Sequence, residues 1–385
     1  MKKLISILLI LSTINCLFVG CSHEIPKEGL SETFNPSTFE VTEMTTTPLP
    51  VSLIQKVALI TDCDSIDDHA YNQACWQGVE NWCSANSIDY TYYQPTEDSN
   101  DARVIAVDQA VQEGANVIVM PGYLFGATLI ERQDKYPDVY FIAVDVGAGD
   151  MTYDYVDYYE PSPNAVCLTF AEEQAGYLAG YAAVKEGYTK LGFNGGAAIL
   201  SVIRYGYGFI QGADAAASEM DVDIYIRYSY EGQFCCDGYS EFLGKMKQWE
   251  ESGIEIIFPC GYRAPGYAKD LDAQIIAPDT DMSHISPTIL TSAKKELKNS
   301  VEFALTGLYE GRWEAKLGGQ FINLTLQDGD FVGLPTTEEA FRFQNLTMEE
   351  YEAVKADIRN GIRIVSDAFE FLPAVSEHTV IDEIG

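Results

Sequence analysis

Residues 56–84 read Lys-Val-Ala-Leu-Ile-Thr-Asp-Cys-Asp-Ser-Ile-Asp-Asp-His-Ala-Tyr-Asn-Gln-Ala-Cys-Trp-Gln-Gly-Val-Glu-Asn-Trp-Cys-Ser. Residues 56–61 form an almost continuous apolar run, which predicts a strand buried on both faces. A helix is expected over 70–84, where apolar residues recur at helical spacing: Tyr71, Cys75, Val79 and Trp82. A buried strand that leads directly into a helix is typical of a parallel α/β fold.

The same alternation continues through the first part of the chain. Further strands are expected at 88–93, 116–120 and 139–145, and helices at 101–113 and 124–135. Apolar strands separated by amphipathic helices indicate a parallel sheet that is covered on both faces.

The pattern then restarts and describes a second, similar unit. The expected strands are 190–194, 223–229, 254–258, 274–277 and 322–326, and the expected helices are 171–185, 202–219, 239–252 and 292–312. The fold class is therefore α/β, with two doubly wound, Rossmann-like lobes. Ligands of open α/β sheets bind at the carboxyl ends of the strands, so a central cleft between the lobes is the expected binding site.

The N-terminus carries an export signal. Lys2 and Lys3 precede an apolar stretch over 4–19, and the Val-Gly pair before Cys21 resembles a bacterial lipobox. We expect a signal peptide at 1–20 and a lipid on Cys21, with a plain signal peptide as the alternative. Residues 22–52 are rich in Ser, Thr, Glu and Pro, so 21–52 is expected to be a flexible tether. No later stretch is apolar enough to span a bilayer.

Charge and length narrow the function. The chain has 385 residues, 24 basic and 58 acidic, with a net charge of −34. An acidic field of this size repels phosphate backbones, so a nucleic-acid partner is excluded. Two lobes account for the roughly 330 residues that follow the tether.

Cysteine and histidine patterns give no sign of a metal or cofactor. Seven of the nine cysteines lie beyond the signal region, and neither they nor the four histidines have the spacing of a zinc site. The odd number also disfavours a disulfide framework. No nucleophile–base arrangement and no P-loop is visible, so catalytic residues, metals and cofactors are all expected to be absent.

The aspartate cluster after the first strand has two interpretations. Asp62, Asp64, Asp67 and Asp68 resemble the calcium-binding aspartates of nucleoside hydrolases, in which the metal activates water. However, the segment is one residue shorter than that family's motif, which moves the last two carboxylates out of register.

The second interpretation needs no gap. The segment resembles the opening motif of the basic membrane protein family of substrate-binding lipoproteins, with matches at Asp62, Ile66, Asp68, Asn72, Gln73, Trp76 and Gly78. The resemblance continues in order over about 55–370. Later matching stretches include Gly122-Tyr123, 136–145, 170–180, 190–196, 204–213, 279–281 and 290–295.

This resemblance implies a type I periplasmic-binding-protein fold and a non-catalytic role in an ABC importer. The ligand would be a purine nucleoside, held as the two lobes close about a hinge. The ligand-binding residues by motif position would be Tyr71, Asn72, Tyr205, Asp145, Asp62, Gly261, Asp279 and Lys295.

Each position has an implied role. The rings of Tyr71 and Tyr205 would stack on the base. Asn72 and Asp145 would read the base edge, assisted by Asp62. Asp279 and Lys295 would hold the ribose hydroxyls, and Gly261 would let the backbone approach the sugar.

Structural alternatives remain for these residues. The two tyrosines could be core aromatics, Asp62 or Asp68 helix caps, Asp145 a solvated strand end, and Lys295 a surface lysine with Lys294 as its rival. The segment from Gly261 to Asp279 departs from the family pattern. Arg263 in it could contact a phosphate or carboxylate, which leaves ligands other than a nucleoside open.

The expected organisation follows. The first lobe comprises 53–168 and about 288–318, the second 169–287 and about 319–372, and 373–385 is a tail. The partners would be a permease and a separate ATPase, with the membrane reached only through the lipid. The protein would act as a monomer at the extracytoplasmic face of the cell membrane. A sensor with the same fold is the alternative to an importer.

Overall fold

The computed structural model describes residues 53–384, apart from Cys63, His69, 232–238, 262–265 and Tyr267; only the backbone of Tyr239 is described. The described residues belong to one unit of the chain. The signal peptide, the tether with Cys21, and Arg263 lie outside the described residues.

The first sheet is wholly parallel. Its strands are β1 (Lys56–Ile60), β2 (Asp89–Tyr93), β3 (Val117–Pro121), β4 (Tyr140–Val144), β5 (Ala165–Phe170) and β11 (Gln320–Leu324). Their order is β11-β5-β4-β3-β1-β2.

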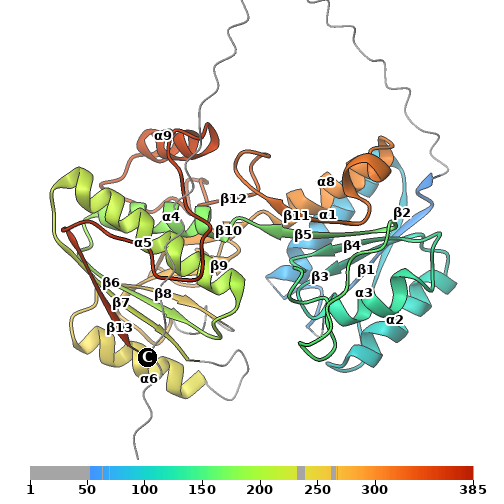
Figure 1. The fold of residues 1–385 in the computed structure, drawn as a ribbon, viewed down its shortest axis with the longest axis horizontal. Helices are drawn as coiled ribbons and strands as arrows, with labels where there is room; N and C mark the ends of the chain where they lie inside the picture. The colour runs from blue at the N-terminus through green and yellow to red at the C-terminus, as the bar shows by residue number, and fades with distance from the viewer. Residues whose placement is uncertain are drawn as a thin grey trace, which may run out of the picture. The chain divides into compact units, whose positions relative to one another are not determined.

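Helices cover both faces of this sheet (Figure 1). They are α1 (Tyr71–Asn86) and α8 (Leu297–Tyr309) on one face, and α2 (Asn100–Gln112) and α3 (Phe125–Gln133) on the other. The alternation of β1 explains this arrangement. Val57 and Leu59 belong to the buried cluster that contains α1, whereas Ala58 and Ile60 belong to the cluster that contains Phe125 of α3.

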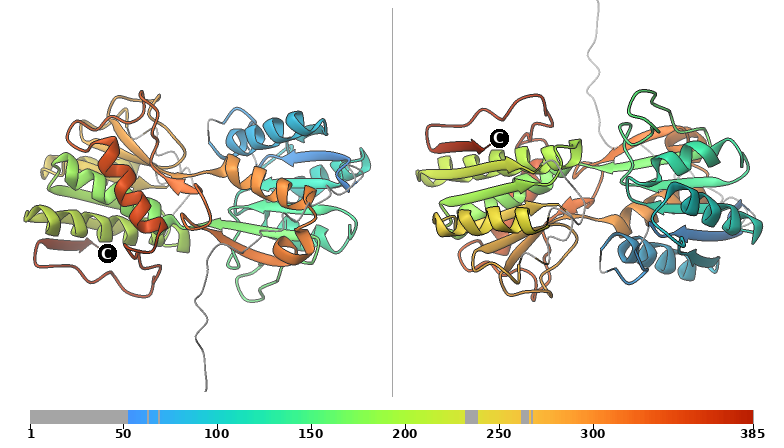
Figure 2. Two further views of the ribbon diagram at one scale, coloured as in Figure 1. Left: turned by 90° about the horizontal axis from the view of Figure 1, so that it is seen from above. Right: turned by 90° about the horizontal axis from the view of Figure 1, so that it is seen from below.

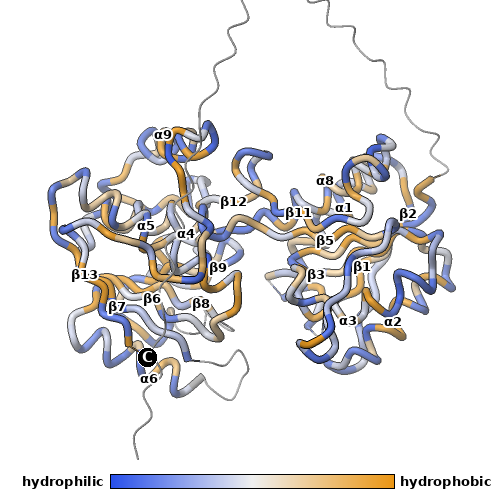
Figure 3. The backbone as a smooth tube through the Cα atoms, viewed as in Figure 1, coloured by the Kyte–Doolittle hydropathy of each residue, from blue (hydrophilic) through white to orange (hydrophobic). Residues whose placement is uncertain are grey.

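The second sheet contains one antiparallel strand. Its members are β6 (Lys190–Gly195), β7 (Ile224–Tyr230), β8 (Ile256–Cys260), β9 (Gln274–Asp279), β10 (Ile289–Lys295), β12 (Val332–Gly333) and β13 (Thr379–Ile384). The order is β12-β10-β9-β8-β6-β7-β13, and only the pairing of β12 with β10 is antiparallel. Figure 2 shows β13 at the outer edge, and Figure 3 shows apolar segments gathered in the strands of both sheets.

The remaining helices belong mainly with the second sheet. They are α4 (Glu172–Glu186), α5 (Leu200–Met220), α6 (Tyr239–Glu251) and α9 (Met348–Arg359), and a π-helical turn lies at Trp313–Leu317. The prediction of two doubly wound parallel sheets is confirmed.

The two sheets repeat one topology. The order β5-β4-β3-β1-β2 in the first corresponds to β10-β9-β8-β6-β7 in the second. In each unit a helix follows the first strand: α1 follows β1, and α5 follows β6. Residues at matching strand ends therefore occupy equivalent places in the two lobes.

The helix expected over 292–312 is present as α8, but it is shorter and begins later than predicted. Residues 289–295 form β10, which pairs with β9, and the helix begins only at Leu297. A short buried run cannot be distinguished as strand or helix from periodicity, and sheet pairing decides it here.

The chain crosses between lobes at other points than expected. Strand β11 pairs with β5 of the first sheet, although the sequence pattern places 319–372 in the second lobe. Strand β10 belongs to the second sheet rather than the first lobe. The expected tail contains β13, which pairs with β7. Strand β5 and helix α9 were not predicted, although Thr347 and Glu350 form a capping box at the start of α9.

Helices α4 and α5 approach one another closely. A Cβ on Gly176 would lie 2.2 Å from the carbonyl oxygen of Tyr205, and one on Gly208 would lie 2.0 Å from that of Glu173. Only glycine permits this backbone contact. The packing therefore holds the first turn of α4 against the second turn of α5, where several buried charges lie.

Candidate functional site

Lys295, the last residue of β10, is the centre of a buried ionic cluster. Its Nζ lies 2.9 Å from Asp145 Oδ2, 3.1 Å from Glu172 Oε1 and 3.5 Å from Asp279 Oδ1. The ammonium also lies between 5.6 and 5.9 Å from the ring centroids of Tyr71, Phe170 and Tyr205. The lysine is thus an interior group, and not the surface residue of the alternative interpretation.

Two tyrosine–aspartate pairs flank the lysine in a repeated arrangement. The hydroxyl of Tyr71 donates to Asp145 Oδ2 at 2.9 Å, and that of Tyr205 donates to Asp279 Oδ1 at 3.2 Å. The partners are 74 residues apart in both pairs. One pair comes from each lobe, and Lys295 joins them.

Both aspartates have an unusual backbone conformation. Asp145 follows β4 with φ of 61°, and Asp279 ends β9 with φ of 67°, so both lie in the left-handed region. This region is uncommon for residues other than glycine, although Asp and Asn enter it more readily. Strands β4 and β9 are equivalent in the two sheets, so the repeat places two equivalent carboxylates at one cluster.

The pKa values in the cluster follow from burial and from the excess of three carboxylates over one ammonium group. Burial alone would lower the pKa of Lys295, but Asp145, Glu172 and Asp279 outweigh it and hold that pKa well above its usual value. Burial raises the pKa of Glu172 and of Asp279, and Lys295 offsets part of each rise. The side chains of Asp145 and Asp279 are 15% and 25% exposed, against 2% for Lys295 and Glu172. The accessible groups of the cluster are therefore hydrogen-bond acceptors.

Sequence reasoning did not identify a second ionic layer below this cluster. Arg204 lies 3.9 Å from both Glu172 and Glu173, which open α4. Both glutamates are buried, and burial raises the pKa of Glu173 to about 7, with a smaller contribution from Glu172. The two adjacent glutamates lie in the matching stretch 170–180 and are visible in the sequence, but their burial depends on the contact between α4 and α5.

Glu173→Gln is expected to stabilise the protein at alkaline pH. A raised carboxyl pKa contributes stability below the usual value of 4.5, and that stability is lost as pH rises through about 7. The variant should therefore gain up to about 3 kcal/mol at pH 8 and nothing at pH 4.5. Urea unfolding at the two pH values measures the gain, with exposed Glu251→Gln as the control. An equal gain at both pH values would contradict the assignment.

Asp62 and Asn72 bond to each other. Asn72 Nδ2 donates to Asp62 Oδ1 at 2.8 Å, and Asn72 Oδ1 accepts from the backbone N–H of Asp62 at 3.2 Å. Asn72 is fully buried. The pair ties the end of β1 to the first turn of α1 and so fixes Tyr71, the first residue of that helix.

Asp68 caps the start of α1. Its oxygens accept from the backbone N–H groups of Ala70, Asn72 and Gln73 at 2.8 to 3.0 Å. This is the capping role that the sequence left open. Within the residues that the structure describes, no group of three or more His, Cys, Asp or Glu could hold a metal ion.

Tyr205 does not present an open ring. It is 1% exposed, its ring packs edge-on against Phe258 at 5.5 Å, and its single hydroxyl proton is shared between Asp279 and the carbonyl of Ala293, which lies 3.1 Å away. The expectation of a stacking surface at Tyr205 is therefore corrected: the residue is a core aromatic that positions Asp279. The phenol fits because its hydroxyl has buried acceptors to satisfy it.

Gly261 directly follows β8. A Cβ there would lie 3.6 Å from Gly196 and 3.7 Å from Phe242, which is ordinary contact distance. Gly196 donates its backbone N–H to the carbonyl of Cys260 at 2.9 Å. There is therefore room beside the backbone at Gly261, enough for at least a Cβ atom.

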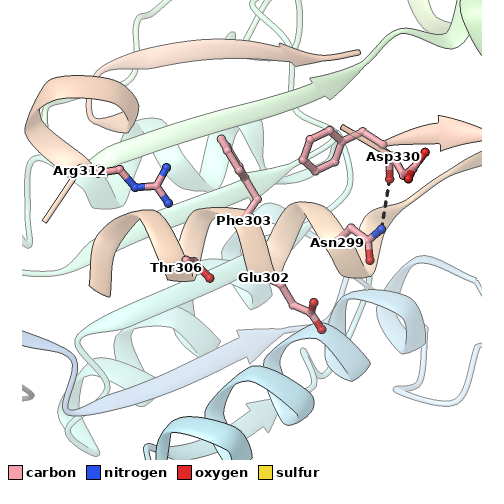
Figure 4. Close-up of a pocket in the computed structure, with 7 residues that line it drawn as sticks. Asn299, Glu302, Phe303, Thr306, Arg312 and Asp330 are labelled. Carbon is pink, nitrogen blue, oxygen red and sulfur yellow. Dashed lines mark hydrogen bonds between the residues drawn. The ribbon is translucent and has the colours of Figure 1, made fainter. Parts of the chain in front are cut away.

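A separate hollow on α8 is lined by none of the residues described above (Figure 4). Asn299 donates to the carbonyl of Asp330 at its edge, at 3.1 Å. The lining residues are Asn299, Glu302, Phe303, Thr306, Arg312, Asp330 and Phe331. None of them is an expected site residue.

Comparison with solved structures shows which fold this is. A solute-binding protein of an ABC transporter system from Conexibacter woesei aligns with a TM-score of 0.63 and 19% identity, over 82% of this chain and 100% of the other. This likeness shows the fold, a two-lobed binding-protein fold of type I.

The family is shown by sequence. The family described as "ABC transporter substrate-binding protein PnrA-like" matches residues 54–368, and the chain belongs to it. An ABC transporter nucleoside-binding protein BmpA from Lactococcus lactis is 25% identical over 337 residues, covering 80% of this chain and 87% of the relative. Basic membrane protein A1 of Borrelia garinii is 30% identical over 291 residues, covering 72% and 79%.

Membership establishes the general function. The chain is an ABC transporter substrate-binding protein, so its partners are a small-molecule ligand and a transporter permease. Such proteins act outside the cytoplasm. In the part of the chain that the structure describes, no helix has the length and apolar character needed to cross a bilayer.

Proposed function

We propose that this protein captures a purine nucleoside and delivers it to an ABC importer without chemical turnover. The observation that supports this proposal is the cluster around Lys295. In it the partly accessible ring of Tyr71 lies beside two partly accessible carboxylates, those of Asp145 and Asp279. A ligand that suits this cluster needs one flat face and several hydrogen-bond donors. A nucleoside has both, and the relative from Lactococcus lactis is named as a nucleoside-binding protein.

The roles follow from position. Tyr71 stacks on the base, and Asp145 accepts from its edge. Asn72 and Asp62 support that end of the site. On the other lobe Asp279 accepts from the ribose hydroxyls, Lys295 donates to the sugar, and Gly261 admits the sugar to the backbone. Tyr205 acts through Asp279.

Closure is the proposed mechanism of capture. Lys295 Nζ contacts Asp145 of the first lobe at 2.9 Å and Asp279 of the second at 3.5 Å. A ligand that donates hydrogen bonds to both aspartates replaces part of these contacts and favours the closed form. The closed monomer then docks on the permease, and a separate ATPase drives transport.

Purine nucleosides should raise the thermal stability of the full chain. At a concentration one hundred times the dissociation constant, inosine, guanosine or adenosine should add about 2.7 kcal/mol. A thermal unfolding series measures this, with free ribose and free hypoxanthine as controls. No shift with any of the three nucleosides would overturn the ligand assignment. Release of free base from inosine would instead indicate an enzyme.

We also propose a lipid anchor on Cys21. The Val-Gly-Cys sequence and the polar segment that follows support it. Cys21→Ser should move the protein from the membrane fraction to the soluble fraction and abolish labelling by a palmitate analogue. Cys16→Ser, within the segment to be removed, is the control and should leave both unchanged.

A further inference from the structure

The loop between β4 and β5 exposes a cluster of large aromatic and apolar side chains. Over residues 151–160, which we call the tyrosine loop, five such side chains are at least 40% exposed. They are Tyr153 (50%), Tyr155 (78%), Val156 (75%), Tyr158 (57%) and Tyr159 (40%). Soluble proteins seldom leave contiguous apolar side chains this exposed unless a partner covers them.

The tyrosine loop is held in its shape from within. Asp154 Oδ1 accepts from the backbone N–H groups of Val156 and Asp157 at 2.9 and 3.0 Å. The rings of Tyr153 and Tyr159 meet edge to face with centroids 5.5 Å apart. A surface that is already ordered loses little entropy when a partner binds.

The base of the loop is joined to the ligand site. Gly147 donates its N–H to Asp150 Oδ2 at 2.8 Å, two residues after Asp145. Met151 is fully buried, and a Cβ on Gly126 of α3 would clash with the carbonyl of Asp150 at 1.9 Å. The base of the loop is thus held beside Asp145, at the carboxyl end of β4, and packs against α3.

The charge of the loop selects its partner. Asp154, Asp157 and Glu160 are exposed among the tyrosines, and the sequence from 136 to 184 contains no lysine or arginine. The complementary surface is apolar at its centre with basic groups around it. Tyrosine is among the residues that dominate binding energy at protein interfaces.

We propose that the tyrosine loop is the surface by which the first lobe docks on the extracytoplasmic face of the permease. The inference rests on the importer role that family membership assigns, and does not depend on which ligand is bound. Because the loop is anchored beside Asp145, closure on a ligand changes its position relative to the second lobe. The permease would therefore distinguish the closed form from the open form by the position of the tyrosine loop.

The test compares two variants of the full chain for binding to the cognate permease–ATPase complex in nanodiscs. The loop variant is Tyr155→Asn/Val156→Ser/Asp157→Lys. Asparagine is chosen because Tyr155 has φ of 58°, which asparagine tolerates. The matched control is Ile105→Ser/Asp138→Lys, on α2 and before β4, at exposed positions away from the loop. Binding of the loop variant should weaken about tenfold or more, and the control should bind as the parent does.

Three further measurements distinguish a loss of docking from misfolding, from a loss of ligand binding and from self-association. Both variants should unfold at the parent temperature and bind inosine within about twofold of the parent affinity. Unchanged permease binding by the loop variant, or equal loss in the control, would overturn the proposal. So would a parent chain that is dimeric by light scattering and becomes monomeric with the loop variant, because the loop would then join two copies. Failure of the nucleoside assignment would appear only in the ligand titration.

Discussion

Lys295→Met should lower the free energy of unfolding by about 3–5 kcal/mol at pH 7, because it leaves buried carboxylates without their cation. Asp145, Glu172 and Asp279 all lie within 3.5 Å of the ammonium. Methionine keeps most of the volume of the side chain, so the loss is electrostatic. Urea unfolding of the two proteins measures it.

The neighbouring lysine is a matched control. Lys294 forms its own ion pair with Glu296 at 2.7 Å, and the two side chains are 20% and 27% exposed. Lys294→Met should therefore cost less than about 1 kcal/mol. A similar loss in both variants would show that the cluster does not depend on Lys295.

The pH dependence of the Lys295→Met variant provides a second check. Burial already raises the pKa of Glu172 and of Asp279, and Lys295 opposes that rise. Without the lysine both carboxyl groups hold their protons to higher pH in the folded state. Their contribution is then present at low pH and lost as pH rises. The deficit should accordingly shrink towards pH 4.5, whereas a packing defect would not change with pH.

Tyr205→Ala should destabilise the fold by about 3–5 kcal/mol, as large aromatic truncations in cores do. Tyr205 is buried against Phe258 and bonded to Asp279. Tyr71→Ala should instead act mainly on the ligand. Loss of base stacking costs about 1–3 kcal/mol, or about 5- to 150-fold in the dissociation constant.

Phenylalanine variants separate the ring from the hydroxyl. Tyr71→Phe keeps the stacking face and removes the donor to Asp145, so nucleoside affinity should fall by less than in Tyr71→Ala. Tyr205→Phe leaves the carbonyl of Ala293 without its donor and should cost about 1–2 kcal/mol of stability. For all four variants, calorimetric titration measures the nucleoside affinity and urea unfolding measures the free energy of unfolding. Wild-type affinity in Tyr71→Ala would place the ligand elsewhere.

Much of the architecture could be predicted from local pattern. The apolar run at 56–61 and the helical spacing that follows locate β1 and α1 within two residues of their ends. The restart of the pattern in the second half indicates the second sheet. These features are local, because a buried strand must be apolar throughout and an amphipathic helix must repeat every 3.6 residues.

Pairing partners could not be predicted in the same way. The end of β10 falls within the helix expected over 292–312, β11 falls within the part expected for the second lobe, and β13 falls within the expected tail. Each was decided by a sheet edge contributed by residues far away in the chain. Local propensity contains no information about which edge is available.

The same distinction between local and long-range information applies to the site. Tyr71, Asp145, Asp279 and Lys295 could be proposed from the sequence, because their positions match the motifs of the family that the chain resembles. Only the tertiary structure showed that one lysine joins equivalent aspartates from both lobes, that Glu172 lies beneath it, and that Tyr205 belongs to the core. Burial and charge pairing depend on distances between segments up to 224 residues apart, and only folding sets those distances.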